Sequence, residues 1–208
     1  MEKYITYSCL ISEHAVYKNK KLLFENKEVD VPGFLLSVYK HFEINYSRFY
    51  KMDNLSKLGW LASEILLKDS FKKENYLPED IGLILSNANS SLDTDQKYMV
   101  SVSDIPRSSM FVYTLPNIVT GEISIRNNFK GEGAFFIFEN FNAAFIENYV
   151  VSLLDNNVFQ VCICGWVELL GDEYKAVLFL VEKVKTNDAV SFTKEQMSTI
   201  FNDEKINQ

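Results

Sequence analysis

Thiols and imidazoles are the side chains best suited to nucleophilic or metal-assisted chemistry, and this sequence has few of them. There are three cysteines, Cys9, Cys162 and Cys164, and two histidines, His14 and His41. Cys162 and Cys164 lie two apart in a strand-like segment, so both thiols point to one face. A metal site needs further ligands at a recognisable spacing, and no histidine supplies one. We therefore interpret the cysteines as buried structural residues in a reducing compartment.

Two short motifs approach a cofactor or metal loop without completing one. The stretch "GEG" at 131–133 has two glycines of a dinucleotide loop, but it precedes a strand instead of following one. The stretch "DTD" at 93–95 resembles the start of a calcium loop, yet Lys97 stands where an oxygen ligand is needed. We expect a solvated helix start at 93–95, no cofactor and no metal.

Length and charge limit the class of protein. The chain has 208 residues, is 47% hydrophobic and carries a net charge of -7, which is typical of one globular domain. Its 21 Lys and Arg residues are scattered, so neither nucleic acid nor an anionic membrane surface is an expected partner. The N-terminus lacks a continuous apolar region and no segment offers roughly 20 apolar residues. A cytoplasmic location is expected.

Alternating strand and helix patterns predict an α/β fold, with a mixed sheet flanked by helices. The segment 17–33 is polar and punctuated by Pro32 and Gly33, which predicts a loop or small hairpin. Residues 1–190 are expected to form one domain, and 191–208 a tail with a short helix. Strands are predicted at 4–11, 81–87, 134–138, 158–168 and 174–184, and helices at 53–69, 93–102 and 142–157.

Four segments together resemble the N-terminal half of the β-ketoacyl synthase family, which has the thiolase fold. They occur in family order and the resemblance covers roughly residues 48–183. The segments read "RFYKMDNLSKLGWLASEILL", "YLPEDIGLILSNANSSLDTDQKYM", "SSMFVYTLPNIVTGEISIRNNFKGEG" and "CICGWVE", the last with Gly165 and Glu168. The resemblance implies the fold of a ketosynthase N-terminal half.

The family's catalytic groups have no counterparts here. In the family, a strand after the position of Gly131 runs into a tight turn, where the nucleophilic cysteine begins a buried helix and has its pKa lowered. The flanking segments place that cysteine at Glu139 or Asn140. The family's two histidines belong to the second half of the fold, which this sequence does not reach. Asn140 is expected to cap the helix, and Glu139 to be a polar stand-in for part of an acyl group.

The resemblance implies a non-catalytic, chain-length-factor-like partner in fatty-acid, polyketide or polyene-pigment biosynthesis. Family enzymes are dimers, so the expected partner is a full-length ketosynthase in a heterodimer or a second copy in a homodimer. Four aromatic residues are candidates for an acyl tunnel or an interface, with ordinary core packing as the alternative: Phe111, Phe136, Phe138 and Phe141.

Two alternatives remain open from the sequence. The first is a small acyl-thioester enzyme with a reassigned nucleophile or base, for which Cys9, His14 and Glu139 are the candidates. The second is a scaffold that docks acyl carrier protein. Carrier proteins are acidic, so this alternative rests on basic residues. Those candidates are Arg107, Arg126 and Lys130.

Overall fold

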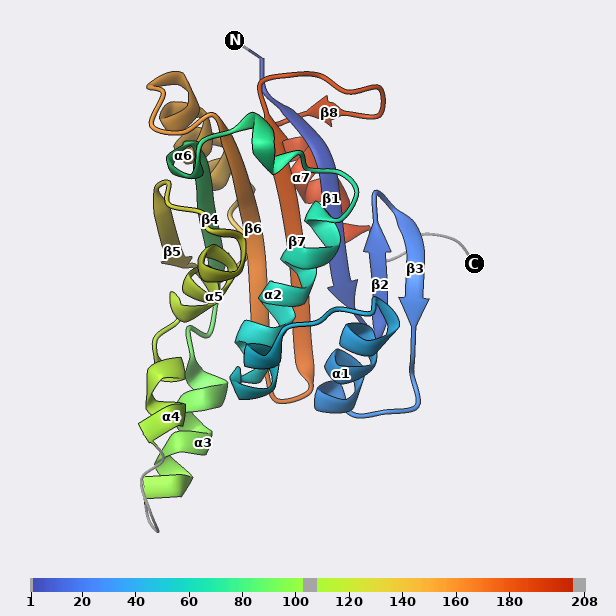
Figure 1. Ribbon diagram of the computed structural model, residues 1–208, viewed down its shortest axis with the longest axis vertical. Helices are drawn as coiled ribbons and strands as arrows, with labels where there is room; N and C mark the ends of the chain where they lie inside the picture. The colour runs from blue at the N-terminus through green and yellow to red at the C-terminus, as the bar shows by residue number, and fades with distance from the viewer. Residues whose placement is uncertain (1, 103–107, 204–208) are drawn as a thin grey trace.

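The computed structural model describes residues 2–102 and 108–203, and it contains a mixed sheet with helices on both faces (Figure 1). The strand order is β3-β2-β1-β7-β6-β4-β5, and β8 pairs with β1. β4 runs parallel to β5 and β6, whereas the other pairs are antiparallel. The strands are β1 Tyr4–Ser12, β2 Ala15–Lys18, β3 Lys21–Glu25, β4 Ile81–Asn87, β5 Gly133–Ile137, β6 Val161–Leu170, β7 Glu173–Glu182 and β8 Val190–Ser191.

The centre of the sheet explains the apolar runs of the sequence. Every residue of β4 is buried, as expected for a parallel strand covered on both faces. β6 and β7 form a long hairpin that turns at Gly171, where φ is 62°. The α/β fold with a mixed sheet is confirmed, and so are the strands expected in these segments.

Gly165 lies in β6 where β7 approaches most closely. Its φ is 150°, and a Cβ built there would lie 2.0 Å from the carbonyl oxygen of Val177. Glycine is the residue that accepts both this backbone conformation and this approach. The "CICGWVE" segment therefore needs its glycine for the hairpin to form.

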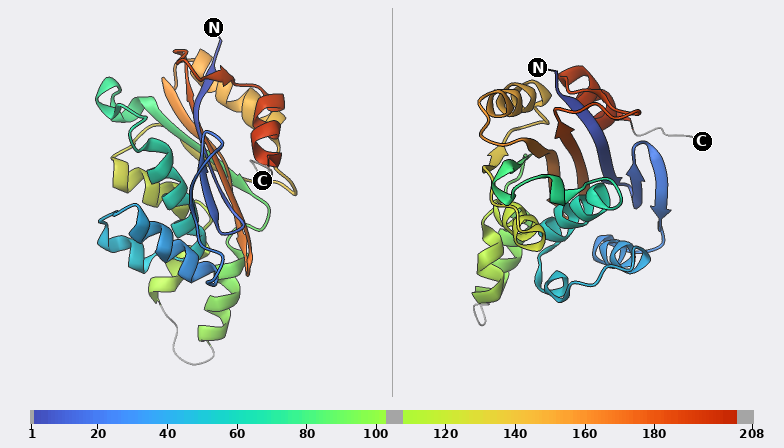
Figure 2. Two further views of the ribbon diagram at one scale, coloured as in Figure 1. Left: turned by 90° about the vertical axis from the view of Figure 1, so that its right-hand side faces the viewer. Right: turned by 45° about the horizontal axis from the view of Figure 1, so that its top comes forward.

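The helices form two layers, one on each face of the sheet (Figure 2). α1, α2 and α5 pack over one core cluster, while α6 and α7 pack over the other. No helix within the described ranges is both long and apolar enough to cross a membrane. The longer helices are α1 Val31–His41, α2 Asn54–Leu67, α3 Leu92–Val102, α5 Ile118–Asn127, α6 Ala143–Asp155 and α7 Lys194–Asn202.

α2 shows how local signals position an element in this fold. Asp53 is its N-cap, and the Asp53 carboxylate accepts a hydrogen bond of 2.9 Å from the backbone N of Ser56. Leu58, Trp60 and Leu61 are fully buried in the core cluster on this face of the sheet. The predicted helix at 53–69 is therefore confirmed.

α1 was not predicted, because Pro32 and Gly33 indicated a loop. The hairpin predicted in this segment is confirmed as β2 and β3, but the loop prediction for residues 31–33 is wrong. Asp30 caps α1 by accepting a hydrogen bond of 2.9 Å from the backbone N of Gly33. Proline is tolerated in the first helical turn, since its missing N–H has no partner there. Phe34 and its buried neighbours then hold α1 on the core.

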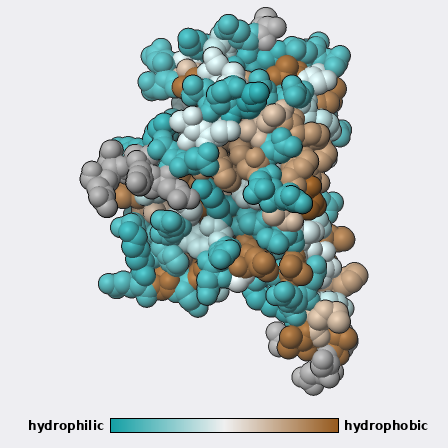
Figure 3. All heavy atoms as spheres, turned by 180° about the vertical axis from the view of Figure 1, so that it is seen from behind, coloured by the Kyte–Doolittle hydropathy of each residue, from teal (hydrophilic) through white to brown (hydrophobic). Residues whose placement is uncertain are grey.

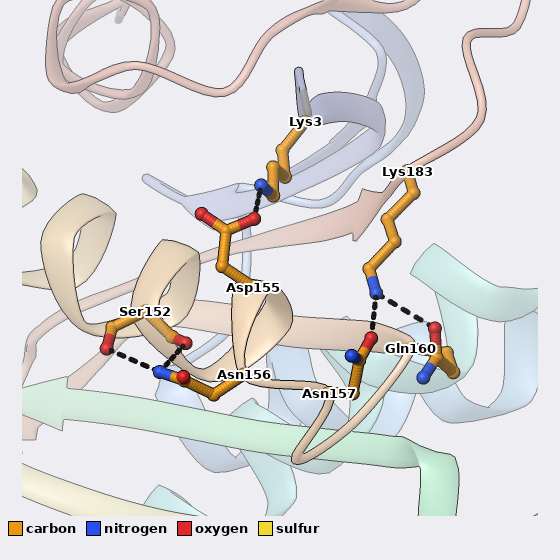
Figure 4. A network of polar contacts seen from close by, with 7 residues as sticks. All are labelled: Lys3, Ser152, Asp155, Asn156, Asn157, Gln160 and Lys183. Carbon is orange, nitrogen blue, oxygen red and sulfur yellow. Dashed lines mark hydrogen bonds and ion pairs between the residues drawn. The ribbon is translucent and has the colours of Figure 1, made fainter.

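Polar contacts fix the C-terminal end of α6 (Figure 4). Lys3, just before β1, forms an ion pair with Asp155, the last residue of the helix. This hydrogen bond from Lys3 holds the pKa of Asp155 below its ordinary value. Lys183, just after β7, donates to Asn157 Oδ1 at 3.1 Å and to Gln160 Oε1 at 2.9 Å. These contacts join the end of the helix and the loop after it to the ends of two strands.

Candidate functional site

The turn between β5 and α6 is the place where the resemblance locates catalysis. The chain runs from Gly131 through β5 into a turn and then into α6, as expected from the family pattern. The N-cap of α6 is Asn142, whose Oδ1 accepts a hydrogen bond of 3.0 Å from the backbone N of Phe145. The prediction that Asn140 caps the helix is therefore wrong. The turn extends two residues further, and an Asn directly before "AAFI" was the signal for the cap.

A hollow of about 660 Å³ opens at this turn, between the N-termini of α6 and α7. Glu139 and Asn140 are exposed on its border. Among the described residues that line it, there is neither a thiol nor an imidazole. The lining thus lacks the side chains that form an acyl thioester and activate it. The assignment of the family's cysteine position to Glu139 or Asn140 stays a prediction. The lining residues are Phe138, Glu139, Asn140, Phe141, Asn142, Ala143, Ala144, Lys194, Glu195 and Ser198.

Phe136 and Phe138 belong to an aromatic group at the edge of the sheet. The Phe136 ring lies 4.8 Å from that of Phe145 and 5.1 Å from that of Tyr149, both on α6. Phe138 lies 4.9 Å from Phe145. All four side chains are partly buried, and β5 is the last strand in the sheet order. These rings therefore pack α6 onto an edge strand and keep part of their surface exposed.

Phe141 lies in the turn and is held by α7. Its ring lies 4.6 Å from that of Phe201, 6.1 Å from that of Trp166 and 6.3 Å from that of Phe179. Lys175 extends over the Phe201 ring at 4.5 Å. Aromatic packing thus joins the turn to the sheet and to the last helix.

The side chains proposed for a reassigned enzyme do not meet. Cys9 is completely buried in the cluster under α1 and α2, and burial raises the pKa of its thiol to about 12. His14 packs between the rings of Phe34 and Tyr174, at 5.1 and 5.7 Å. Glu139 precedes α6, on the opposite layer. A buried thiol with a raised pKa is a poor nucleophile.

Cys162 and Cys164 are completely buried on the α6 side of the sheet, on one face as expected. Burial also raises the pKa of Cys162 well above its ordinary value. Within the part of the chain that the structure describes, no cluster of metal-ligating side chains is found. Both thiols therefore serve as small core residues.

A second feature, which we call the arm, projects from the body beyond β4 (Figure 1). We define it as α3, the short helix α4 Ser108–Phe111 and the 3-10 turn Val112–Thr114. Figure 3 shows apolar surface gathered at its end. Arg107 falls outside the described residues. Exposed apolar side chains on or next to the arm are Leu92, Met99, Val100, Val102, Phe111, Val112 and Leu115.

A partly buried carboxylate and a buried one attach the arm and the loop before it to the sheet. Glu168, on β6, accepts hydrogen bonds from the backbone N of Ala88 at 2.6 Å and of Asn89 at 3.1 Å. Asp93 accepts from Gly171 N at 3.1 Å and pairs with Lys97 at 2.6 Å. Asp93 is only 5% exposed, so the prediction of a solvated helix start at 93–95 is wrong. Tertiary contacts, which no local pattern encodes, bury it.

The other side of the arm is attached to α2 and α5. Thr94 Oγ1 donates to Asp53 at 2.5 Å, and burial raises the pKa of the Asp53 carboxyl. Glu122, in α5, accepts from Tyr113 Oη at 3.1 Å and from Arg48 at 2.9 Å. Burial, and then the charge of Glu122, raises the pKa of Tyr113. The arm is therefore fixed at its base, while its apolar end is exposed.

The two basic candidates that the structure describes differ in their surroundings. Arg126 Nε lies 3.2 Å from Glu64 Oε2, and its guanidinium lies 4.9 Å from the Tyr46 ring centre. Lys130 is exposed, and its backbone N donates to the carbonyl oxygen of Pro78 at 2.8 Å. Lys130 is thus the more accessible of the two positive charges.

Solved structures with a similar fold include those of ketosynthases and chain length factors. The ishigamide ketosynthase/chain length factor superposes with a TM-score of 0.62 at 15% identity, covering 88% of this chain and 63% of that chain. A type II polyketide synthase ketosynthase in complex with its acyl carrier protein (AntDE:AntF) gives 0.61 at 16%, covering 87% and 62%. The ketosynthase–chain length factor complex ApeO–ApeC from Xenorhabdus doucetiae gives 0.56 at 7%, covering 88% and 80%.

No family model and no curated protein sequence matches the chain. The chain spans less than two thirds of the first two structures that it matches. At these identities the likeness concerns the fold, and it covers 87% or 88% of this chain. The chain therefore has the thiolase-like fold of ketosynthases and chain length factors.

Proposed function

We propose that this chain is a non-catalytic, chain-length-factor-like partner of a β-ketoacyl synthase. The observation that carries the proposal is the arm, which combines a base held by hydrogen bonds to the carboxylates of Glu168 and Glu122 with exposed apolar side chains. Monomeric proteins rarely expose such groups of apolar side chains unless another chain covers them. The product would be a fatty-acid, polyketide or polyene chain built by the partner.

Two further features support a partner role over catalysis. The turn before α6 presents Asn142, Ala143 and Ala144 at the helix N-terminus, without a thiol. β5 lies at the end of the sheet order, so its outer edge offers unpaired backbone groups to a second sheet. An apolar arm and an open strand edge would provide a partner with apolar area and with directional hydrogen bonds. A full-length ketosynthase would cover both, and a second copy of this chain is the other occupant to test.

The proposal is tested by co-expressing the chain with a β-ketoacyl synthase from the same cells and measuring the complex by light scattering after gel filtration. We expect a 1:1 complex that Val100→Asp, on the arm, weakens at least about tenfold. The matched control is Val184→Asp, because Val184 is similarly exposed, at 68% against 76%, but lies after β7. Equal affinity of the two variants, or a stable monomer in the presence of the synthase, would contradict the proposal.

Docking of acyl carrier protein is a separate part of the proposal. It rests on the exposed charge of Lys130 and on Arg126, and one similar structure is a ketosynthase in complex with its carrier protein. Reversing Lys130 to Glu is expected to weaken carrier-protein binding and to reduce its dependence on salt. Lys185→Glu, at an exposed lysine before β8, serves as the control. If both lysine variants bind carrier protein as the parent does, this part fails while the partner role stands.

A further inference from the structure

A groove of about 580 Å³ lies on the helical layer formed by α1, α2 and α5, and it shares only Arg126 with the features used above. Its lining comes from the segment after α1, the second half of α2, the segment that follows α2 and the end of α5. None of these lining residues belongs to the arm, to β5 or to α6. The volume lies within the range of about 300–1,000 Å³ that is typical of small-molecule sites.

The floor of the groove is apolar and partly aromatic. It unites side chains from α2 with rings from the segments on either side. Ile65 and Phe129 are buried beneath it, and the others are partly buried, so the floor is part of the folded core. Such a floor favours a ligand with an apolar body. The floor residues are Phe42, Ile44, Ile65, Leu67, Phe71 and Phe129.

The charges on the rim favour an anionic group. Glu64 accepts a hydrogen bond from Arg126 at 3.2 Å, so these two charges offset each other. The remaining charged residues of the lining are two lysines, Lys68 and Lys73, and one carboxylate, Glu43, so the lining carries an excess of positive charge. The ammonium of Lys68 lies 5.7 Å from the centre of the Phe42 ring, which holds it above the apolar wall. Neither lysine forms an ion pair among the described residues.

We propose that this groove binds a small carboxylate with an apolar body, whose carboxylate lies between Lys68 and Lys73 and whose body covers the floor at Phe42 and Phe71. The chain as a whole carries a net charge of -7, so an excess of positive charge at the mouth of an apolar groove is a local property. Apolar walls also strengthen the attraction between the lysines and an anion. This proposal is independent of the partner role.

The test uses dodecanoate below its micelle concentration as the probe, added to the full chain and followed by calorimetry and by amide NMR shifts. We expect saturable binding with shifts at residues 42–45 and 64–73. Lys73→Glu is expected to weaken binding roughly fivefold or more, the effect of about 1 kcal/mol at one charged contact. The matched control is Lys72→Glu, since Lys72 is also exposed but does not line the groove.

Two further comparisons distinguish a specific site from adsorption to apolar surface. Dodecyltrimethylammonium has the same apolar body with the opposite charge, and it is expected to bind much more weakly. Ile44→Trp, which fills part of the groove, is expected to abolish the shifts while leaving the circular dichroism spectrum unchanged. Equal effects of the two lysine variants would overturn the proposal. So would equal binding of the cationic amphiphile, shifts confined to the hollow before α6, or absence of saturable binding.

Discussion

The carboxylate of Glu168 lies 2.6 Å from the backbone nitrogen of Ala88, which joins the end of β6 to the loop after β4. Glu168→Ala leaves two partly buried backbone donors without their acceptor, at a cost of about 1 kcal/mol in the free energy of unfolding. Hydrogen exchange at residues 88–91 is expected to accelerate, which mass spectrometry measures. Glu173→Ala, at an exposed glutamate of β7, should change neither quantity. Unaltered exchange at residues 88–91 in Glu168→Ala would show that the arm is held in another way.

Substitution of glycine by alanine is expected to have opposite effects on stability at Gly165 and at Gly121. Gly165→Ala places a Cβ 2.0 Å from Val177 O at a φ of 150°, so we expect a loss of more than ~3 kcal/mol in unfolding free energy, or an insoluble chain. Gly121 lies inside α5, and a Cβ there meets no atom within 4 Å. Gly121→Ala should stabilise the fold by about 0.5–1 kcal/mol. Urea unfolding measures both, and a tolerated Gly165→Ala would contradict the hairpin geometry.

Asp53 combines a cap with a buried charge. Asp53→Ala removes the acceptor for Ser56 N and Thr94 Oγ1 and is expected to cost about 1 kcal/mol or more. Asp53→Asn keeps an acceptor for Ser56 without the charge, so it should be close to the parent in stability at pH 7. Urea unfolding of both variants measures these differences, and Asp53→Ala being as stable as the parent would contradict the cap.

The pH dependence of Asp53 follows from the direction of its shift. Its folded pKa is raised, chiefly because burial disfavours the charged carboxylate. The contribution of Asp53 is therefore fully present below its unfolded pKa, about 4, and is lost as pH rises through the folded pKa. Relative to Asp53→Asn, the parent should gain stability as pH falls from 7 toward 4. A relative loss over this range would show that hydrogen bonds outweigh burial at this carboxylate.

Phe111, on the arm, is 56% exposed and contacts Tyr98 at 5.6 Å between ring centres. If the arm lines an acyl tunnel in a complex, Phe111→Ala lengthens the products of a reconstituted pathway and Phe111→Trp shortens them. Mass spectrometry of the products measures the change. Tyr50→Ala, at a ring that is 62% exposed next to α2, is the control. Unchanged product length in both Phe111 variants would restrict the arm to an interface role.

Phe138 is another of the four tunnel candidates, but its substitution affects stability as well as surface. It is partly buried against Phe145, so Phe138→Ala removes core contacts as well as surface. We expect lower stability by about 3–5 kcal/mol at most, because truncating a fully buried ring costs that much. Thermal unfolding of the variant, measured beside product length, separates the two effects. A change in product length without loss of stability would identify Phe138 as a tunnel residue.

Local sequence determined most elements of this fold. The apolar run 81–87 has the length typical of a buried strand, and the apolar period of 53–69 indicates a helix that buries one face. These features depend on residues near one another in the chain, so pattern alone conveys them.

Tertiary structure decided the rest. The local sequence around Asp93 is that of a solvated helix start. Asp93 is buried by contacts with residues far along the chain, among them Gly171, whose backbone N donates to its carboxylate. Pro32 indicated a loop, but residues 31–41 form a helix because Phe34 packs into the core. The position of the cap at Asn142 depended on how far the turn after β5 extends. Long-range packing sets which polar groups are buried and where turns end, and that free energy is absent from any short stretch of sequence.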